Sequence, residues 1–302
     1  MLPIVHHPHY QISLRHGHRA SMSKYGFLRQ RLETSGLLRA GQYAAPAPAS
    51  AGQLTLAHEA SYVSRVFEGT LREEETKAIG LPNCPDVTLR SRLTSSGTLL
   101  AAWLAIETGL AANTAGGSHH ATRTGGAGFC VFNDVAVAAA NLLASGFRGP
   151  ILVIDADVHQ GDGTAEIFDG DDRVFTFSIH AEHNFPSIKA RSDIDIGLPD
   201  RTDDNIYLSR LEVGIRDALK VARPTLVFYN AGVDIWESDR LGRIAVSVDG
   251  IRERERLVLN LIRGAGIPLC MVVGGGYGEN DEVASRHQIF YEEATLFLGK
   301  GF

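Results

Sequence analysis

The sequence predicts an α/β fold in which helices cover both faces of a mostly parallel sheet. From residue 151 onward, short apolar segments alternate with longer amphipathic ones, the pattern of repeated strand-helix units. Hydrophobic residues make up 44% of the chain, and its 32 glycines suit tight turns between strands and helices. Polar side chains follow directly after the apolar segments, where ligands bind in such folds. We expect a single domain over residues 1–302, because α/β enzymes of this length often fold as one unit.

The part of the chain before residue 150 predicts mainly helices. Residues 1–18 are rich in histidine but lack helical or strand spacing, so we expect a loose, solvated N-terminal arm and assign it no function. The Ala- and Pro-rich stretch 44–52 predicts a surface connection, and the glutamate run 73–75 is typical of a solvated helix face. Apolar residues at helical spacing predict helices over residues 23–38, 57–66, 97–107 and 135–145.

The part after residue 150 predicts alternating strands and helices. Because the carboxyl ends of parallel strands meet at one edge, one cleft could collect the polar groups that follow the strands. The run Arg252–Arg256, with alternating charge signs, predicts an exposed helix face. Strands are expected over residues 151–157, 174–180, 225–230 and 269–273, and helices over 205–220, 249–263 and from about Asp281.

The composition argues against several classes of protein. A formal net charge of −6, with no basic run, speaks against direct nucleic-acid binding. Three scattered cysteines suggest a reducing compartment, and the apolar neighbours of Cys130 predict an unreactive thiol. The most apolar window, Thr98–Leu110, contains Glu107 and is too short to span a bilayer, so no membrane partner is expected. Without a recognisable secretion signal, the expected location is the cytoplasm; the sequence specifies no oligomeric state.

The segment Ile151–Gly163 predicts a metal site. Its apolar start predicts a buried strand, and in an extended chain Asp155, Asp157 and His159 lie on one face. Unpaired buried carboxylates are costly, and a bound cation would neutralise them. These oxygen and nitrogen ligands suit zinc or another divalent first-row metal such as iron or cobalt. Asp234 follows another predicted strand and is the candidate third ligand. A metal held by only three residues, Asp157, His159 and Asp234, would keep room for water or substrate.

Further motifs indicate the chemistry. His119 and His120 lie in a glycine-rich loop and could supply a general base and a second proton carrier, with Asp155 and Asp162 fixing their tautomers. Tyr277 follows three glycines and is placed to donate its hydroxyl to a developing oxyanion. Together with a metal, these groups describe hydrolysis of an amide-like bond that needs no serine or cysteine nucleophile.

Five motifs together resemble those of the histone deacetylase superfamily, the zinc-dependent arginase-like amidohydrolases. They occur in the family's order and span at least residues 90–280. The compact length and the segment Ser238–Arg243 look most like the class IV branch and its bacterial relatives. The resemblance implies a three-layer α/β/α domain with a sheet of about eight strands. The motifs are Gly116-Gly117-Ser118-His119-His120-Ala121, Gly128-Phe129-Cys130 with Asn133-Asp134, Asp155–Gly163, Asn230–Asp234 and Gly274–Tyr277.

The resemblance also implies residue roles. Zinc would bind the three ligands named above, and the two histidines would form the catalytic pair, with His120 as the base and Tyr277 as the oxyanion donor. It further implies a tunnel for an acyl-lysine and a structural potassium ion bound partly by backbone carbonyls. The tunnel residues would be Gly128, Phe129, Phe185 and Leu241; the potassium ligands would be Asp155, Asp157, His159, Ser178 and Ile179.

Two positions depart from the family pattern. Gln160 replaces a histidine common in eukaryotic members, which we expect to alter the surroundings of the metal without removing it. The segment Asn83–Asp86 does not align cleanly with the aspartate by which larger deacetylases grip a peptide, so the resemblance does not extend to their peptide-backbone recognition.

The sequence therefore predicts a zinc amidohydrolase that removes acetyl or longer acyl groups from lysine side chains of proteins. The first alternative is a deacetylase of small molecules such as acetylpolyamines, which needs the same catalytic groups. A catalytically silent acyl-lysine reader and a two-manganese ureohydrolase are weaker alternatives. The complete set of ligands, histidines and Tyr277 argues against the reader, and the adjacent histidines with Tyr277 argue against the ureohydrolase.

Overall fold

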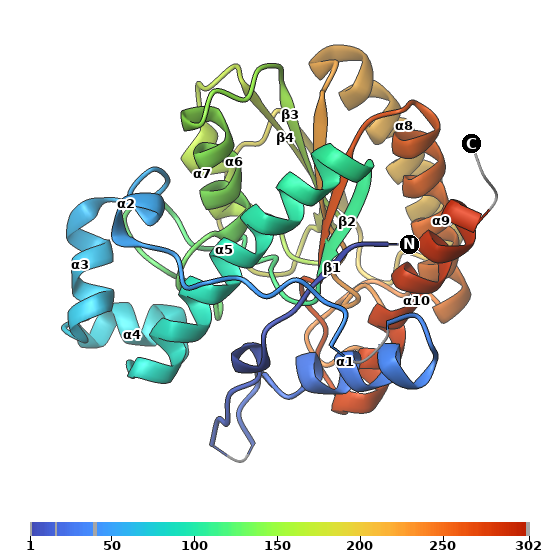
Figure 1. The fold of residues 1–302 in the computed structure, drawn as a ribbon. Coiled ribbons are helices and arrows are strands. Elements are labelled where there is room, and N and C mark those ends of the chain that lie inside the picture. The colour runs from blue at the N-terminus through green and yellow to red at the C-terminus, as the bar shows by residue number, and fades with distance from the viewer. Residues whose placement is uncertain (1, 16, 39–40, 300–302) are drawn as a thin grey trace.

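The protein, described here by a computed structural model, is built on a seven-stranded, all-parallel sheet within the described residues 2–15, 17–38 and 41–299. The strand order is β1-β2-β7-β6-β3-β4-β5 (Figure 1). The α/β fold class is confirmed, with seven strands where about eight were expected. The strands are β1 Ile4–Val5, β2 Leu110–Asn113, β3 Ile151–Asp155, β4 Val174–Ala181, β5 Ile194–Leu198, β6 Leu226–Asn230 and β7 Leu269–Val272.

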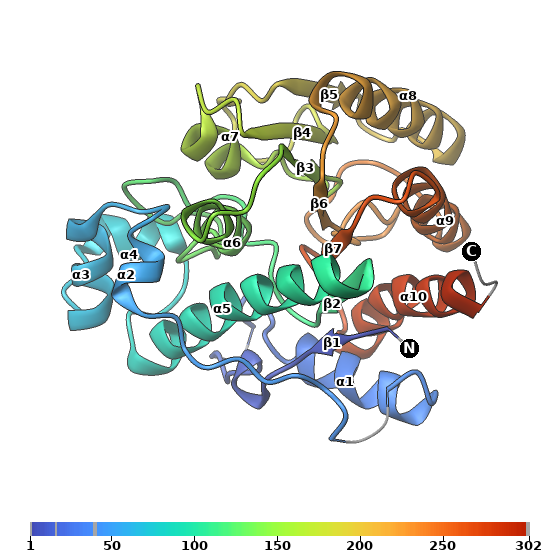
Figure 2. The same ribbon diagram turned by 45° about the horizontal axis from the view of Figure 1, so that its top comes forward.

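Helices cover both faces of the sheet, as the alternating pattern predicts. Turning the molecule shows α5, α6 and α7 on one face and α8, α9, α10 and α1 on the other (Figure 2). Helices α2, α3 and α4 lie outside α5. The bounds are α1 Lys24–Thr34, α2 Ala51–Leu54, α3 Ala60–Glu68, α4 Glu73–Ile79, α5 Pro85–Thr108, α6 Asp134–Ala144, α7 Asp162–Phe168, α8 Asp204–Ala222, α9 Val248–Gly264 and α10 Asn280–Gly299. None of the described helices is long and apolar enough to cross a membrane.

Local sequence signals explain where several helices begin. The Asn133 side chain accepts a hydrogen bond from the Ala136 amide at 2.9 Å and so caps α6. Ser247 caps α9 in the same way through the Gly250 amide at 2.9 Å. Helix α5 begins with Pro85 in its first turn and is capped at its C-terminus by Gly109, whose φ of +89° favours glycine. The expected helix over 97–107 is therefore the second half of a longer one.

The N-terminal residues correct the expectation of a loose, solvated arm. Val5 is fully buried, and β1 pairs in parallel with β2 at the edge of the sheet. The His6 ring lies 2.7 Å from the Thr114 hydroxyl, and the Tyr10 side chain is fully buried. A two-residue strand is too short to show an alternating pattern. Its burial depends on β2, a neighbour more than a hundred residues away in the sequence.

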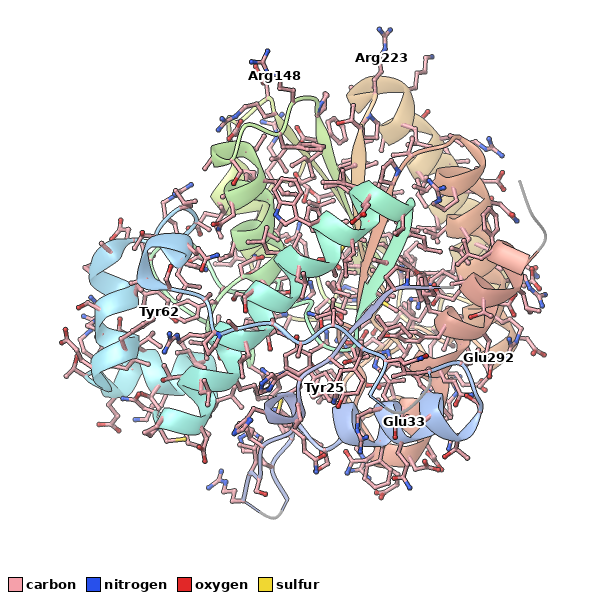
Figure 3. The ribbon with its side chains drawn as sticks, viewed as in Figure 1. Tyr25, Glu33, Tyr62, Arg148, Arg223 and Glu292 are labelled. Atoms are coloured by element: carbon pink, nitrogen blue, oxygen red, sulfur yellow. The ribbon has the colours of Figure 1, made fainter. Side chains whose placement is uncertain are left out.

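The sheet brings two ligand-bearing loops together. Strands β3 and β6 are hydrogen-bonded neighbours, and Asp155 pairs with Asn230 at their carboxyl ends. From β3 the chain continues to β4 on one side, and from β6 it continues to β7 on the other, so the connections diverge here. Figure 3 marks the opposite end of the sheet, where Arg148 and Arg223, which shortly precede β3 and β6, project from the molecule.

Candidate metal centre and active site

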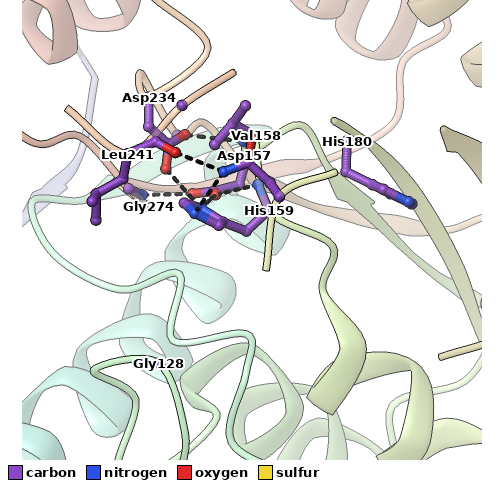
Figure 4. Close-up of polar contacts among 12 residues, drawn as sticks. Gly128, Asp157, Val158, His159, His180, Asp234, Leu241 and Gly274 are labelled. Carbon is purple, nitrogen blue, oxygen red and sulfur yellow. Dashed lines mark hydrogen bonds and ion pairs between the residues drawn. The ribbon is translucent and has the colours of Figure 1, made fainter. Parts of the chain in front are cut away.

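Asp157, His159 and Asp234 form one buried group beyond the ends of β3 and β6 (Figure 4). One ligand atom from each lies within 4.8 Å of the others, close enough to hold one metal ion. His159 Nδ1 lies 3.0 Å from Asp157 Oδ1 and 3.1 Å from Asp234 Oδ2. The sequence thus identified three residues that the fold brings together, and each is at most 7% exposed.

Backbone groups hold the two carboxylates in place. The Val158 amide donates to Asp234 Oδ1 at 3.0 Å, which ties one ligand loop to the other. The Gly275 amide donates to Asp157 Oδ2 at 2.7 Å. A Cβ atom on Gly275 would lie 2.0 Å from Asp234 Oδ2, so only glycine lets this backbone approach the ligands so closely.

The electrostatics of the group fit a cation. Burial opposes a charge on His159, but Asp157 and Asp234 outweigh it and raise the pKa of His159 to about 10. Burial and the neighbouring Asp157 raise the pKa of Asp234 to about 7. Two buried carboxylates thus attract positive charge strongly, and their oxygens with an imidazole nitrogen are ligands that zinc and related metals accept. The residues present therefore fit a divalent metal.

The two histidines of the glycine-rich loop lie beside this group, each held by a carboxylate. His119 Nδ1 lies 2.7 Å from Asp155 Oδ2, and His120 Nδ1 lies 2.5 Å from Asp162 Oδ1. Asp155 and Asp162 are the two carboxylate partners that the sequence predicts for these histidines. In both histidines the carboxylate fixes Nδ1 and leaves Nε2 to face other groups; His119 Nε2 lies 3.9 Å from Asp157 Oδ1.

The protonation of the two histidines differs. Burial disfavours a charged His119, but Asp155 and Asp157 dominate and raise its pKa to about 9. Burial, together with the neighbouring charge on His119, lowers the pKa of His120 to about 4 despite the Asp162 hydrogen bond. At neutral pH the metal-free pair therefore holds one charged and one neutral imidazole.

A cavity of about 250 Å³ leads to these groups. The Phe185 ring lies edge-on to His120 with 4.8 Å between ring centres. The ring centres of Phe129 and Tyr277 are 6.2 Å apart. Burial and the nearby Asp234 raise the pKa of Tyr277 well above its ordinary value, so its phenol stays protonated. All four predicted tunnel residues line the cavity. Its lining consists of Arg19, His120, Gly128, Phe129, His159, Asn184, Phe185, Leu241 and Tyr277.

The predicted potassium ligands lie at the ends of β3 and β4. Asp155 and Ser178 are register partners on these adjacent strands, and Ile179 is the next residue of β4. The Ser178 hydroxyl lies 3.0 Å from His180 Nδ1. This arrangement brings the residues to one region, and their role in binding potassium stays a prediction.

The two departures from the family pattern have clear structural contexts. Gln160 is fully buried and donates to Ala190 O at 2.9 Å and to Asp195 Oδ1 at 2.8 Å, which ties the ligand loop to β5 and the segment before it. Asn83 donates to Gly69 O at 2.9 Å, and Asp86 lies in the first turn of α5. Neither Asn83 nor Asp86 belongs to the described lining of the cavity.

The sequence reasoning missed Arg254 and expected it on an exposed helix face. Arg254 is instead fully buried, and so is Glu255, with which it forms an ion pair. Its guanidinium donates to Gly232 O at 2.6 Å and to Ala156 O at 3.3 Å. These carbonyls belong to the two loops that carry Asp157 and Asp234. Alternating charges in general predict an exposed helix face. No signal in the local sequence reveals that backbone carbonyls of two distant loops accept hydrogen bonds from Arg254.

The sequence also provided no indication of two further residues that support the site, Asp239 and Lys24. Asp239 accepts hydrogen bonds from the amides of Leu241 at 2.9 Å and Tyr277 at 2.8 Å, and so joins two residues that line the cavity. Lys24 donates to Gly274 O at 2.9 Å beneath the glycine turn. The prediction for Cys130 agrees with the structure, since burial raises the pKa of its thiol far above the ordinary value.

Comparisons with known proteins agree with the fold and with the motifs. Residues 18–292 match the histone deacetylase domain. Histone deacetylase 2 of Arabidopsis thaliana is 31% identical over 269 residues, covering 86% of this chain and 70% of that protein. An uncharacterized protein of Picosynechococcus is 44% identical over 293 residues, covering 97% and 98% of the two chains. The crystal structure of the HDA15 HD domain has a similar fold, with a TM-score of 0.76 and 20% identity over 97% of this chain and 89% of that one.

Proposed function

The chain belongs to the histone deacetylase family, as a hydrolytic deacetylase, and we propose that it removes acetyl or longer acyl groups from lysine side chains of proteins. The observation that carries the proposal is the buried group of Asp157, His159 and Asp234, with His159, His120 and Tyr277 lining one cavity. The assignment to the class IV branch and the expected cytoplasmic location stay predictions.

We propose zinc as the ion held by Asp157, His159 and Asp234, with iron or cobalt as alternatives. When bound, such a metal activates water and polarises the acyl carbonyl. His159 lines the cavity, and three protein ligands would leave a position for water or substrate, which supports a catalytic rather than a closed structural site. We keep the structural potassium ion as a second proposal for the ends of β3 and β4.

We propose that His120 is the general base. It lines the cavity, and its low pKa leaves the imidazole neutral at pH 7, so Nε2 can accept a proton from the attacking water. Asp162 holds Nδ1 and so fixes the tautomer in which Nε2 carries no proton. His119, held by Asp155 at 2.7 Å, lies beside His120 and suits a second proton carrier.

Tyr277 lines the same cavity and completes this arrangement. Its phenol stays protonated and therefore keeps a hydrogen to donate to the oxyanion that forms when water adds to the carbonyl. The backbone amide of Tyr277 is held by Asp239, and the ring lies 6.2 Å from that of His159. The residue therefore approaches the reacting carbonyl from a fixed backbone position.

The cavity suits an acylated amine on an aliphatic chain. Phe129, Phe185 and Leu241 supply apolar walls around a volume of about 250 Å³, which can pack against the methylene groups of a lysine. An acetylpolyamine has a similar aliphatic chain and is the alternative substrate. A reader without activity is not favoured, because it would not require a base, an oxyanion donor and metal ligands around one cavity.

The proposal is tested by a substrate panel. Metal-stripped protein is reloaded separately with zinc, iron or cobalt and assayed with acetyl-, butyryl- and myristoyl-lysine peptides and with acetylspermidine. We expect a higher kcat/KM for at least one lysine peptide than for acetylspermidine. The opposite order with every metal would replace the protein substrate by the small-molecule alternative, and equal inactivity on all substrates would reject both.

A further inference from the structure

The segment before α1 places one arginine at the cavity and anchors its backbone on both sides. His18 Nε2 lies 2.9 Å from Gly80 O, and His18 Nδ1 accepts from the Ala20 amide at 3.1 Å, so the ring spans from this segment to the end of α4. The Ser21 hydroxyl donates to Asn280 Oδ1 at 2.5 Å. Arg19 therefore extends from a backbone that is tied to two other parts of the fold.

Arg19 lines the same cavity as His120 and Tyr277, and its side chain is exposed to solvent. It forms no hydrogen bond or ion pair with any residue that the structure describes. Two other arginines on the loop that carries Leu241 differ in this respect. Arg240 pairs with Glu279 at 2.8 Å, and Arg243 pairs with Asp200 at 3.2 Å.

The charge on Arg19 is also uncompensated within the cavity. The described lining contains two histidines and this arginine, but no aspartate or glutamate. Lys189, on the neighbouring loop, is occupied by Asn184 O at 2.6 Å and Pro186 O at 2.7 Å. A guanidinium binds carboxylates through two parallel hydrogen bonds, and this pairing suits a planar anion that arrives with the substrate.

We propose that Arg19 forms a carboxylate-binding subsite at the acyl-lysine cavity. The substrate would carry a carboxylate close to the acylated side chain. It could be the side chain of an acidic neighbour in a peptide or the α-carboxylate of a terminal acyl-lysine. The inference rests on the proposed lysine deacylase function and deepens it. Because an acetylpolyamine carries ammonium groups where this subsite expects an anion, Arg19 also disfavours that alternative substrate.

The experiment compares acetyl-lysine peptides of equal length with aspartate, asparagine or lysine on both sides of the acetyl-lysine. A second pair of peptides ends in acetyl-lysine, as free acid or as amide. Wild type, Arg19→Gln and Arg19→Glu are assayed at low ionic strength. We expect wild type to favour the aspartate peptide over the lysine peptide roughly two- to fivefold, the scale of exposed ion pairs, chiefly through KM. Arg19→Gln should remove the preference, and Arg19→Glu should reverse it.

The terminal pair separates the two sources of the carboxylate. A preference for the free acid over the amide, lost in Arg19→Gln, assigns the subsite to the α-carboxylate; a preference confined to the internal peptides assigns it to acidic neighbours. Arg240→Gln is the control, because Arg240 is already paired with Glu279. This variant should leave both preferences unchanged.

Two outcomes overturn the proposal. If wild type hydrolyses the asparagine peptide but does not distinguish charge in either series, or if Arg19→Glu keeps the wild-type order, there is no carboxylate subsite at Arg19, and the deacylase function stands. If no acetyl-lysine peptide is hydrolysed while acetylspermidine is, the proposed function and the subsite both fail.

Discussion

His119 and His120 are adjacent in the chain, with ring centres 4.1 Å apart, yet their pKa values shift in opposite directions. Both rings are buried, and burial lowers the pKa of each. Asp155 and Asp157 overcome this for His119, whereas the charge on His119 adds to the effect of burial on His120. Burial, reinforced by the neighbouring His119, thus lowers the pKa of His120, which supports different roles for the two histidines.

This difference in roles predicts the effect of Asp162→Asn. An asparagine amide can donate to His120 Nδ1, which would move the imidazole proton to Nε2 and block proton uptake from water. We expect kcat on an acetyl-lysine peptide to fall by about 10²–10⁴-fold with unchanged metal content. Steady-state kinetics and elemental analysis measure both. An undiminished kcat would show that Asp162 does not control the base.

Tyr277→Phe removes one hydroxyl and keeps the ring. We expect the protein to retain its metal while kcat falls by about 10²–10³-fold, the scale for losing one oxyanion donor. KM should change little, because the oxyanion develops only during the reaction. A variant with wild-type kcat would remove Tyr277 from the chemistry.

Asp234→Ala should release the metal. The change removes one of two carboxylates at His159 Nδ1 and one of three ligands. We expect metal content to fall far below that of wild type after dialysis, with circular dichroism confirming a folded chain. Asp200→Ala, at an exposed ion pair, is the matched control and should keep its metal. A fully loaded Asp234→Ala protein would show that another residue is the third ligand.

Arg254→Met should weaken metal binding although Arg254 lies beyond the ligands. Its guanidinium holds the carbonyls of Ala156 and Gly232, and so fixes the spacing of the two ligand loops. Loss of such supporting contacts typically costs 10–100-fold in metal affinity. Competition with a chelator measures this affinity, and the visible spectrum of the cobalt form reports coordination geometry.

Two further variants separate positioning from general destabilisation. Arg254→Lys should recover part of the affinity, and Arg256→Met, on the exposed side of the same helix, should match wild type. If Arg254→Met is folded and binds metal as tightly as wild type, the carbonyl contacts do not set the ligand spacing.

Buried histidines away from the ligands predict how stability depends on pH. Burial lowers the pKa of His58 to about 4, and its ring lies 2.7 Å from Thr122 O. The unfolded chain takes up this proton below pH about 6.5 and the folded chain does not, so stability is lost as pH falls from about 6.5 to 4, by up to about 1.4 kcal/mol per pH unit.

Urea unfolding of wild type at pH 7 and pH 5 measures this loss. His58→Gln should show a smaller loss between the two values, whatever its stability at pH 7, and His9→Gln, at an exposed histidine, should show the wild-type loss. Equal losses in His58→Gln and wild type would exclude His58 as the titrating group.

The sequence was informative about residues that directly follow a strand with a clear apolar pattern. Asp157, His159 and Asp234 follow strands whose apolar pattern is clear, and the ends of adjacent parallel strands must lie together. It was misleading where burial depends on distant partners. Arg254 is buried by carbonyls of two other loops, and Val5 is buried where β1 pairs with β2. Neither contact leaves a pattern in the local sequence.

The two-residue strand β1 has a practical consequence for work with this protein. Its parallel pairing occupies the outer edge of β2, which would otherwise present free amide and carbonyl groups. Trimming the first dozen residues as dispensable would bare that edge and invite strand addition by another copy. A purification tag is therefore better added ahead of Ile4 than used to replace the first residues. A chain shortened for crystallisation should also keep β1.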